Sequence, residues 1–387
     1  MKEDIRNSCM ENCEGIQKKR VYAKYNRDCS GLRGKAIGVF KPKNSIQLKE
    51  FIKKNPHVCI RGGGSGLVGG CIPINEPVLD MSLMDKIISL DLNKSCVEVE
   101  AGIILNDLQN YLVVRGYEIP LYVCSGKSAT IGGMIATNSS GIRGIKYGRF
   151  SEWVNWIEVI NSEGEAEMKS RIDLSDYAGM EGISGVISKA NLKIIKKIER
   201  TASIISSDYI EDIIKKVKGQ KLNPKVCAIE MLDKTISEYL HLPFKYHLIV
   251  EYESEEGEKK AQDYFQTMEL LYLAYNVILN REKKYRIEDF KVFLDKFDKV
   301  FTYLESYEIP IFASISMGII HPCFPEEKLN LIPEIAKIVR KFGGNINPCY
   351  GIGLAKKELV DINDKRLIES MKKRLDPSNK FNQSKII

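Results

Sequence analysis

The amino-acid sequence predicts an α+β protein with two domains. The chain has 387 residues, 44% of them hydrophobic, and a chain of this size exceeds the usual limit for a single hydrophobic core. Residues 35–110 alternate short apolar strands with turns, whereas long helical patterns between a few strands follow residue 201. We therefore expect a domain boundary near residue 200, followed by a compact antiparallel α+β unit.

Short strands dominate the first region. Strands are predicted at residues 36–40, 58–60, 78–81 and 96–100. A helix capped by Ser45 is predicted through residue 52, and a second helix over residues 105–114. No βαβ unit is predicted around the glycines that follow the second strand.

Residues 120–150 are rich in glycine, serine and threonine but carry few charges. This composition is too apolar for a linker and too irregular for a helix, so we expect a buried loop that wraps a ligand. Strands resume at residues 153–160 and 185–195.

The second region is predicted to be mainly helical. Helices are expected at residues 210–217, 258–273, 287–304 and 329–341. The expected strands are residues 247–252 and 310–317.

The charge pattern argues against several classes of protein. The net charge is +7, but charged residues of both signs are mixed along the chain, without the basic stripe of a nucleic-acid-binding module. No apolar run reaches the roughly 18 residues that a membrane-spanning helix needs. The N-terminal residues lack the apolar segment of a secretory signal, so we expect a cytoplasmic protein.

The ten cysteines are scattered, and no two form a CxxC pair. This spacing favours reduced, structural thiols over disulfides. An alternative is that Cys9, Cys13 and Cys29 bind a metal ion.

The strongest functional signal is a glycine cluster directly after an apolar strand. Residues 61–70 read RGGGSGLVGG and contain six glycines. Glycine adopts positive φ angles and lets the backbone approach a ligand closely, and successive N–H groups form a concave nest for an anion such as a pyrophosphate. A nucleotide-kinase P-loop is excluded because the Gly-Lys-Ser/Thr ending is missing, and a Rossmann turn would require a following helix that is not predicted.

A second glycine-rich segment covers residues 124–141 and reads CSGKSATIGGMIATNSSG. Asn138 and the hydroxyl side chains of this segment can hydrogen-bond to the polar edges of a ligand. A glycine-rich surface loop without a ligand is the alternative.

Together, and in this order, the two segments resemble the FAD-binding domain of the vanillyl-alcohol-oxidase and p-cresol-methylhydroxylase (PCMH) superfamily. The nearer resemblance is to its branch of glycolate oxidase flavin subunits, D-lactate dehydrogenases and other FAD-linked oxidases. Residues 61–65 are similar to the pyrophosphate loop of this family, residues 129–141 to its ATIGG segment and residues 181–187 to its EGTLGII segment. Residues 375–382 are similar to its closing segment.

The resemblance implies a division into three parts. Residues 1–200 would form a PCMH-type FAD-binding domain of two subdomains, and residues 201–349 a smaller antiparallel α+β cap domain that contacts substrate. Residues 350–387 would return to the FAD-binding domain.

The resemblance also implies a set of residues that contact FAD. They are Arg61, Gly62, Gly63, Gly64, Ser65, Gly66, Leu67, Ser125, Thr130, Ile131, Gly132, Gly133, Ala136, Thr137, Asn138, Gly141, Gly182, Val186, Ile187 and Asn382. Family members with covalent FAD carry histidine at the position of Ser65 or cysteine at the position of Ser128, so non-covalent FAD is expected here. Cys124 lies four residues before Ser128 and is expected to pack.

The resemblance weakens at the catalytic positions. Lactate and glycolate members place a histidine pair and a Glu-His pair around a metal, whereas Ser314, His321, Cys349 and Tyr350 stand at these positions here. We predict no metal, because too few ligands remain; a site rebuilt from Cys349 and His321 is the alternative. His321 and Tyr350 are the catalytic candidates, against purely structural roles for both.

Two arginines of the second region, Arg281 and Arg286, are candidate partners for an anionic substrate. A surface role is the competing interpretation for each of them.

The expected activity is FAD-dependent oxidation of a 2-hydroxy acid such as D-lactate or glycolate, or of a related alcohol. No iron–sulfur motif is encoded, so the electrons would pass to a separate acceptor, for instance an iron–sulfur protein. Two alternatives remain: a non-catalytic or electron-relay subunit of a glycolate or lactate oxidase complex, and a redox-neutral flavoenzyme of the alkyl-glycerone-phosphate synthase type.

Overall fold

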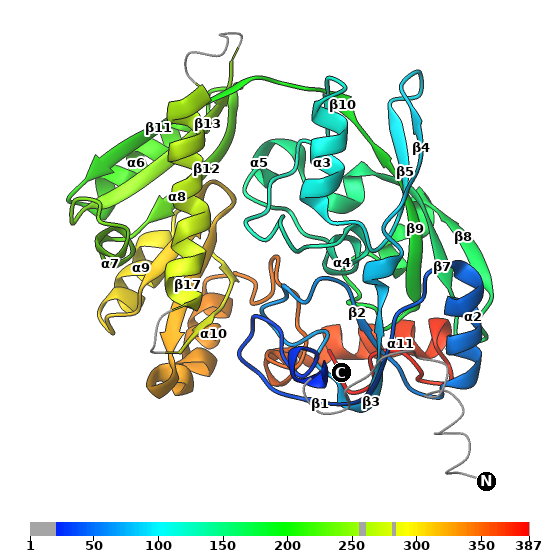
Figure 1. Cartoon of the computed structure of the whole chain (residues 1–387). Coiled ribbons are helices and arrows are strands. Elements are labelled where there is room, and N and C mark those ends of the chain that lie inside the picture. Colours follow the sequence, from blue (N-terminus) through cyan, green and yellow to red (C-terminus); the bar gives the residue numbers. More distant parts are fainter. Residues whose placement is uncertain (1–20, 255–260, 281–283, 387) are drawn as a thin grey trace.

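The computed structural model of the chain describes residues 21–254, 261–280 and 284–386. The predicted α+β class is confirmed, because the two largest sheets in this part of the chain are antiparallel and helices pack against them. Figure 1 shows two bodies, one around the five-stranded sheet and one around the seven-stranded sheet.

A small parallel sheet carries the first glycine-rich segment. Its order is β1 (Lys35–Phe40), β3 (Ile74–Asp80) and β2 (Cys59–Arg61). Helix α2 (Ser45–Lys54) connects β1 to β2, so a strand–helix–strand unit precedes the glycines. The glycines themselves lead into β3 without a helix. Ser45 was predicted to be the N-cap of α2, but the N-cap is the preceding residue, Asn44, whose side chain accepts the Gln47 N–H.

A five-stranded antiparallel sheet forms the centre of the first body. Its order is β4 (Ile87–Asp91), β5 (Cys96–Glu100), β9 (Val186–Lys193), β7 (Val154–Ile160) and β8 (Ala166–Ser170). Helix α3 (Leu105–Val113) buries Leu105, Leu108 and Leu112 in the core of this sheet. A two-stranded ribbon pairs β6 (Tyr117–Glu118) with β10 (Ile195–Lys196).

The second glycine-rich segment is not the purely irregular loop that its composition predicted. Helix α4 (Ile131–Thr137) forms within it, and the Thr130 side chain accepts the Gly133 N–H at 3.3 Å as its N-cap. Ile131, Met134 and Ile135 are buried against the five-stranded sheet, which offsets the low helix propensity of the two glycines. A short helix α5 (Gly144–Tyr147) follows.

The second body is built on a seven-stranded antiparallel sheet. Its strands are β11 (Arg200–Ser207), β13 (Tyr246–Glu253), β12 (Val226–Leu232), β16 (Ile311–Ser314), β17 (Ile319–Pro325), β14 (Tyr285–Ile287) and β15 (Phe290–Lys291). The expectation of only two strands here was wrong. The helix predicted over residues 287–304 was also wrong in its first half, where β14 and β15 pair with β17.

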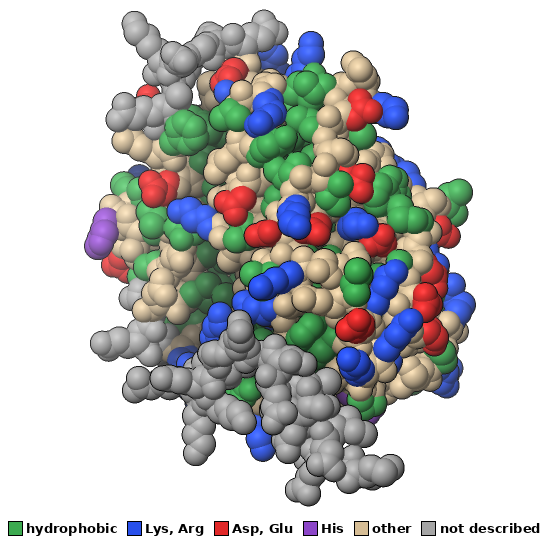
Figure 2. Space-filling view, turned by 45° about the vertical axis from the view of Figure 1, so that its right-hand side comes forward, with side chains coloured by type: hydrophobic (Ala, Val, Ile, Leu, Met, Phe, Trp, Pro, Cys, Tyr) green, Lys and Arg blue, Asp and Glu red, His purple; other side chains and the backbone are tan. Residues whose placement is uncertain are grey.

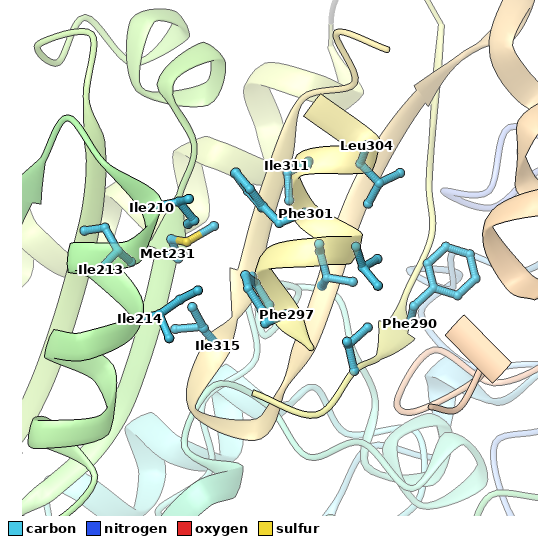
Figure 3. Packing of buried hydrophobic residues seen from close by; sticks show 14 of the residues in the cluster. Ile210, Ile213, Ile214, Met231, Phe290, Phe297, Phe301, Leu304, Ile311 and Ile315 are labelled. Carbon is cyan, nitrogen blue, oxygen red and sulfur yellow. The ribbon is translucent and has the colours of Figure 1, made fainter. Parts of the chain in front are cut away.

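Helices cover both faces of this sheet. Helices α6 (Ile210–Gln220), α9 (Phe297–Glu305) and α10 (Ile332–Lys341) share one core, part of which Figure 3 shows. Helices α7 (Lys234–Tyr239) and α8 (Ala261–Leu279) share the other core. Along β12, Ile229 and Met231 belong to the first core and Ala228 and Leu232 to the second, as alternation along a strand requires.

The C-terminal segment lies against the small parallel sheet. Helix α11 (Ile362–Leu375) is followed by residues that pair with the start of β2: Phe381 bridges Val58, and the Asn382 N–H donates to the Val58 carbonyl at 2.9 Å. The Lys385 ammonium then reaches Glu76 at 2.8 Å in the buried interior. Figure 1 shows α11 beside this sheet.

Short 3-10 turns complete the described elements, at Val21–Lys24, Met81–Leu83, Phe150–Trp153, Arg171–Asp176, Ile315–Met317, Glu326–Leu331 and Lys357–Leu359.

No helix in the described ranges is both long and apolar enough to cross a membrane. On the face drawn in Figure 2, basic and acidic side chains are interspersed.

Candidate functional site

A cavity of about 400 Å³ lies where the two glycine-rich segments meet the seven-stranded sheet. One wall consists of residues 62–68 and of residues from the second segment. The facing wall comes from α8 and from the turn between β16 and β17. The cavity therefore joins segments that lie far apart in the sequence.

Glycine is required where the two segments touch. A Cβ atom on Gly62 would lie 2.3 Å from the Thr130 hydroxyl, and one on Gly63 would lie 1.6 Å from the Ser128 carbonyl oxygen. Both distances are far below van der Waals contact. The side-chain-free backbone thus lets the two segments pack directly against each other.

Replacing Gly63 by alanine is expected to push the segments apart at a cost of about 1–3 kcal/mol and to reduce the bound FAD. The flavin-to-protein absorbance ratio of the purified variant measures this. Gly219→Ala is the matched control, because a Cβ there meets no atom within 4 Å. Full FAD content in Gly63→Ala would show that close packing of the two segments is not needed.

The first segment presents a row of free backbone donors. Within the described residues, the N–H groups of residues 63–67 donate no backbone or side-chain hydrogen bond, although these residues border the cavity. Several free backbone N–H groups in succession can form a nest for an anion. This arrangement suits a diphosphate.

Arg61 supports this segment from outside the cavity. Its Nη1 donates to the Arg27 carbonyl at 2.8 Å, and its guanidinium fills the space beside Gly64. Asn138 ends α4 in the left-handed region with φ 48°, and its side chain accepts the Ser151 N–H at 3.1 Å. Neither residue lines the cavity.

The other predicted cofactor residues fall into two groups. Ile131 and Val186 are buried in hydrophobic cores rather than in the cavity wall. The remaining ones line the cavity: Gly62, Gly63, Gly64, Ser65, Gly66, Leu67, Ser125, Thr130, Gly132, Gly133, Ala136, Thr137, Gly141, Gly182, Ile187 and Asn382.

Glu181 also lines the cavity, and the sequence prediction missed it. Its carboxylate accepts the N–H groups of Ile352 at 2.6 Å and Gly353 at 3.0 Å, and its own carbonyl accepts the Asn382 side chain at 2.6 Å. Burial raises the pKa of Glu181 to about 7, although the two backbone donors act in the opposite direction. The sequence did carry a signal for Glu181, because it is the first residue of the segment 181–187 that resembles the family's EGTLGII segment.

His321, on β17, and Tyr350 come together on one side of the cavity. Their rings stack with centroids 5.0 Å apart, and the Tyr350 hydroxyl lies 2.6 Å from that of Tyr275 on α8. His321 is 2% exposed, and burial lowers its pKa to about 4, so the imidazole is neutral near pH 7. Its Nδ1 has no hydrogen-bond partner among the described residues.

A buried ion pair positions the loop that carries Tyr350. One carboxylate oxygen of Asp289 accepts the N–H groups of Cys349 at 2.8 Å and Tyr350 at 2.9 Å. The other pairs with the ammonium of Lys356, which also donates to the Ile346 carbonyl at 2.7 Å. Asp289 and Lys356 are both fully buried, and neither was singled out from the sequence.

The family's metal positions are occupied differently here. Ser314 lines the cavity and donates to Glu230 at 2.8 Å, and burial raises the pKa of Glu230 well above its usual range. Across the described ranges, no three His, Cys, Asp or Glu side chains gather closely enough to hold a metal ion. Cys9 and Cys13 lie outside those ranges.

Arg286 is engaged away from the cavity, in an ion pair with Glu288 at 2.5 Å and a hydrogen bond to the Ala355 carbonyl at 2.8 Å. Arg281 lies outside the described residues. Cys124 packs beside α8 with its thiol 3.9 Å from the Leu271 carbonyl, and burial raises its pKa.

Residues 36–168 match a family described as "FAD binding domain". This range contains both glycine-rich segments and the row of free amides. The chain carries an FAD-binding domain.

Two curated relatives and one solved structure extend the comparison. The chain is 29% identical over 210 residues to the mitochondrial D-2-hydroxyglutarate dehydrogenase of Arabidopsis thaliana, covering 50% of this chain and 37% of the relative. It is 28% identical over 248 residues to the D-lactate dehydrogenase of Archaeoglobus fulgidus, covering 58% and 56%. The matches thus span about a third to just over half of these relatives.

The solved structure is an alkyldihydroxyacetonephosphate synthase, which superposes with a TM-score of 0.67 at 16% identity over 89% of this chain and 75% of that one. This similarity shows that the two proteins share a fold.

The FAD-binding domain offers residues that fit its cofactor. The amides of residues 63–67 would hold the diphosphate, and Gly62 and Gly63 leave the cradle free of Cβ atoms. Ser65 and Ser128, at the positions of covalent attachment in other family members, both line the cavity as serines. Non-covalent attachment of the FAD therefore stays a prediction.

Proposed function

We propose that the protein is a dehydrogenase that oxidises a 2-hydroxy acid and passes the electrons to a separate acceptor. One observation carries the proposal: a single cavity joins the amide nest of the FAD-binding domain to a buried, neutral histidine with an unpartnered Nδ1. The names of the two curated relatives, a D-lactate and a D-2-hydroxyglutarate dehydrogenase, support it.

His321 would act as the proton acceptor for the substrate hydroxyl. Because burial lowers its pKa to about 4, its ring carries a free lone pair over the physiological range. Tyr350 and Ser314 border the same cavity with hydroxyl groups that can orient the substrate. Bound FAD supplies the group that accepts the hydride, and the chain supplies binding and orientation.

The low pKa of His321 gives a pH dependence with a definite sign. Protonation would remove the base only as the pH falls through about 4, so kcat/KM is expected to be insensitive to this group from about pH 6 to 8. Rates of flavin reduction across buffers from acid to neutral pH measure this. A fall centred near pH 6.5, the unperturbed value of histidine, would contradict the burial argument.

Anaerobic reduction of the flavin tests the function directly. The purified yellow protein is mixed with D-lactate, glycolate and D-2-hydroxyglutarate in turn, and the loss of flavin absorbance is recorded. Bleaching by at least one acid is expected. Stable colour against every donor would favour an electron-relay subunit and overturn the proposal. The acceptor, for instance an iron–sulfur protein, can be sought once a donor is known.

We also propose the division into residues 1–200, 201–349 and 350–387. The change of sheet at Arg200 and the contacts of Phe381 and Asn382 with Val58 support it.

We propose a cytoplasmic location. The eight cysteines of the described residues are all free thiols, which fits a reducing compartment. Cell fractionation tests the location.

A further inference from the structure

The side chain of Lys127 borders the cavity. Among the described residues that line it, Lys127 is the only lysine or arginine. Lys127 lies in the second glycine-rich segment, is exposed, and holds its ammonium 4.7 Å from the centre of the Tyr272 ring on α8. It has no hydrogen-bond or ion-pair partner within the described ranges, so its positive charge is available to a ligand.

Glu181, the acidic residue that lines the cavity, forms no ion pair with Lys127. Glu181 is the only aspartate or glutamate among the described lining residues, and the amides of Ile352 and Gly353 occupy its two oxygens. The cavity therefore offers one unpaired cation to an incoming carboxylate.

The cavity that this cation borders has a mainly apolar and aromatic wall, with Asn276, Ser314 and His321 among its polar members. Tyr272, Tyr275 and Leu279 project from α8, and Met317 and Ile319 come from the turn between β16 and β17. A second carboxylate enclosed by these side chains would lose its hydration without gaining an opposite charge. Enclosing an unpaired charge is strongly unfavourable.

We propose that Lys127 binds the substrate carboxylate and that the cavity selects 2-hydroxy monocarboxylates with apolar side chains over dicarboxylates. This rests on the proposed function, which it narrows: the two curated relatives are named for a monocarboxylate and a dicarboxylate, and this cavity matches the former. Lys127 would fix one end of the substrate while Tyr350 and His321 meet the hydroxyl.

Substrate comparison is the first test. The holoprotein is reduced anaerobically with D-lactate, D-2-hydroxybutyrate and D-2-hydroxyglutarate, and kcat/KM for flavin bleaching is compared. The monocarboxylates are expected to be favoured by about tenfold or more, the effect of one unpaired charge. Equal or better reduction by D-2-hydroxyglutarate would overturn the selectivity.

Binding of non-reducible analogues is the second test and does not depend on turnover. Butyrate and glutarate are titrated into the holoprotein by calorimetry. Lys127→Gln is expected to weaken butyrate binding about tenfold or more, whereas Lys127→Arg retains most of it. Lys337→Gln is the matched control, since Lys337 is exposed on α10 and does not line the cavity.

The remaining outcomes are distinguishable. Unchanged butyrate affinity in Lys127→Gln would overturn the role of Lys127. Reduced FAD content with unchanged butyrate affinity would overturn it too, and would assign the lysine to the cofactor phosphates. Lys127-dependent butyrate binding without flavin reduction by any 2-hydroxy acid would support the carboxylate site and overturn the proposed dehydrogenase activity.

Discussion

Replacing His321 by asparagine is expected to slow flavin reduction by a 2-hydroxy acid by about 10²–10⁴-fold, the usual contribution of a general base. Asparagine retains hydrogen-bonding groups and a similar size but cannot accept a proton. The loss should fall mainly on the rate of bleaching, with little change in FAD content, because the His321 ring stacks on Phe312 and Tyr350 and not on the amide nest. Anaerobic stopped-flow absorbance measures it.

A matched histidine elsewhere separates catalysis from general disturbance. His241 is exposed and lies in the left-handed region with φ 58°, which asparagine tolerates, so His241→Asn should leave the rate unchanged. If His321→Asn bleached as fast as the unmodified protein, a base at this position would be ruled out, and Tyr350→Phe would become the next variant.

Replacing Arg143 by methionine is expected to lower the free energy of unfolding by about 3–5 kcal/mol. Arg143 follows α4 and forms two hydrogen bonds of 2.7 Å with the carboxylate of Glu251 on β13, and it contacts the Tyr264 hydroxyl on α8 at 3.0 Å. Glu251 is fully buried, so the variant leaves a carboxylate without its cation at the junction of the two bodies. Urea denaturation followed by fluorescence measures the loss.

Two further variants test whether the loss of stability comes from the unpaired buried charge of Glu251. In Arg143→Met with Glu251→Leu both charges are gone, and much of the lost stability should return. Lys53→Met removes an exposed pair with Glu165 and should cost less than about 1 kcal/mol. A double variant as unstable as the sum of its single variants would show that the packing, not the stranded charge, matters.

The first glycine-rich segment was predictable because its chemistry is local. The glycines between residues 62 and 70 lack a Cβ atom, so they predict that a ligand or another segment approaches the backbone closely, independently of the rest of the fold. Strands β12 and β17 of the seven-stranded sheet were not predictable, because every one of their residues is buried. A strand buried on both faces loses the alternation of polar and apolar residues that identifies strands in a sequence.

The polar residues that hold the site together were hidden for another reason. Asp289 reaches Lys356 across 67 positions, and Glu181 reaches Ile352 across 171. No local pattern encodes such partners, and each carboxylate resembles a surface residue until the fold buries it. His321 and Tyr350 were found only because their positions matched a family motif. Their rings stack because β17 carries His321 and the Asp289 carboxylate holds the loop that carries Tyr350.

The hydrogen bonds of Asn382 to the strand before the first glycine-rich segment affect how the protein acquires its cofactor in the cell. The Asn382 side chain accepts the Ile60 N–H at 2.8 Å, across 322 positions of the chain, at the strand that leads into the first glycine-rich segment. A ribosome would release that strand long before Asn382 emerges, and contacts so distant in sequence form late in folding. FAD capture should therefore wait until Asn382 has left the ribosome, and nascent chains stalled before this asparagine should remain colourless.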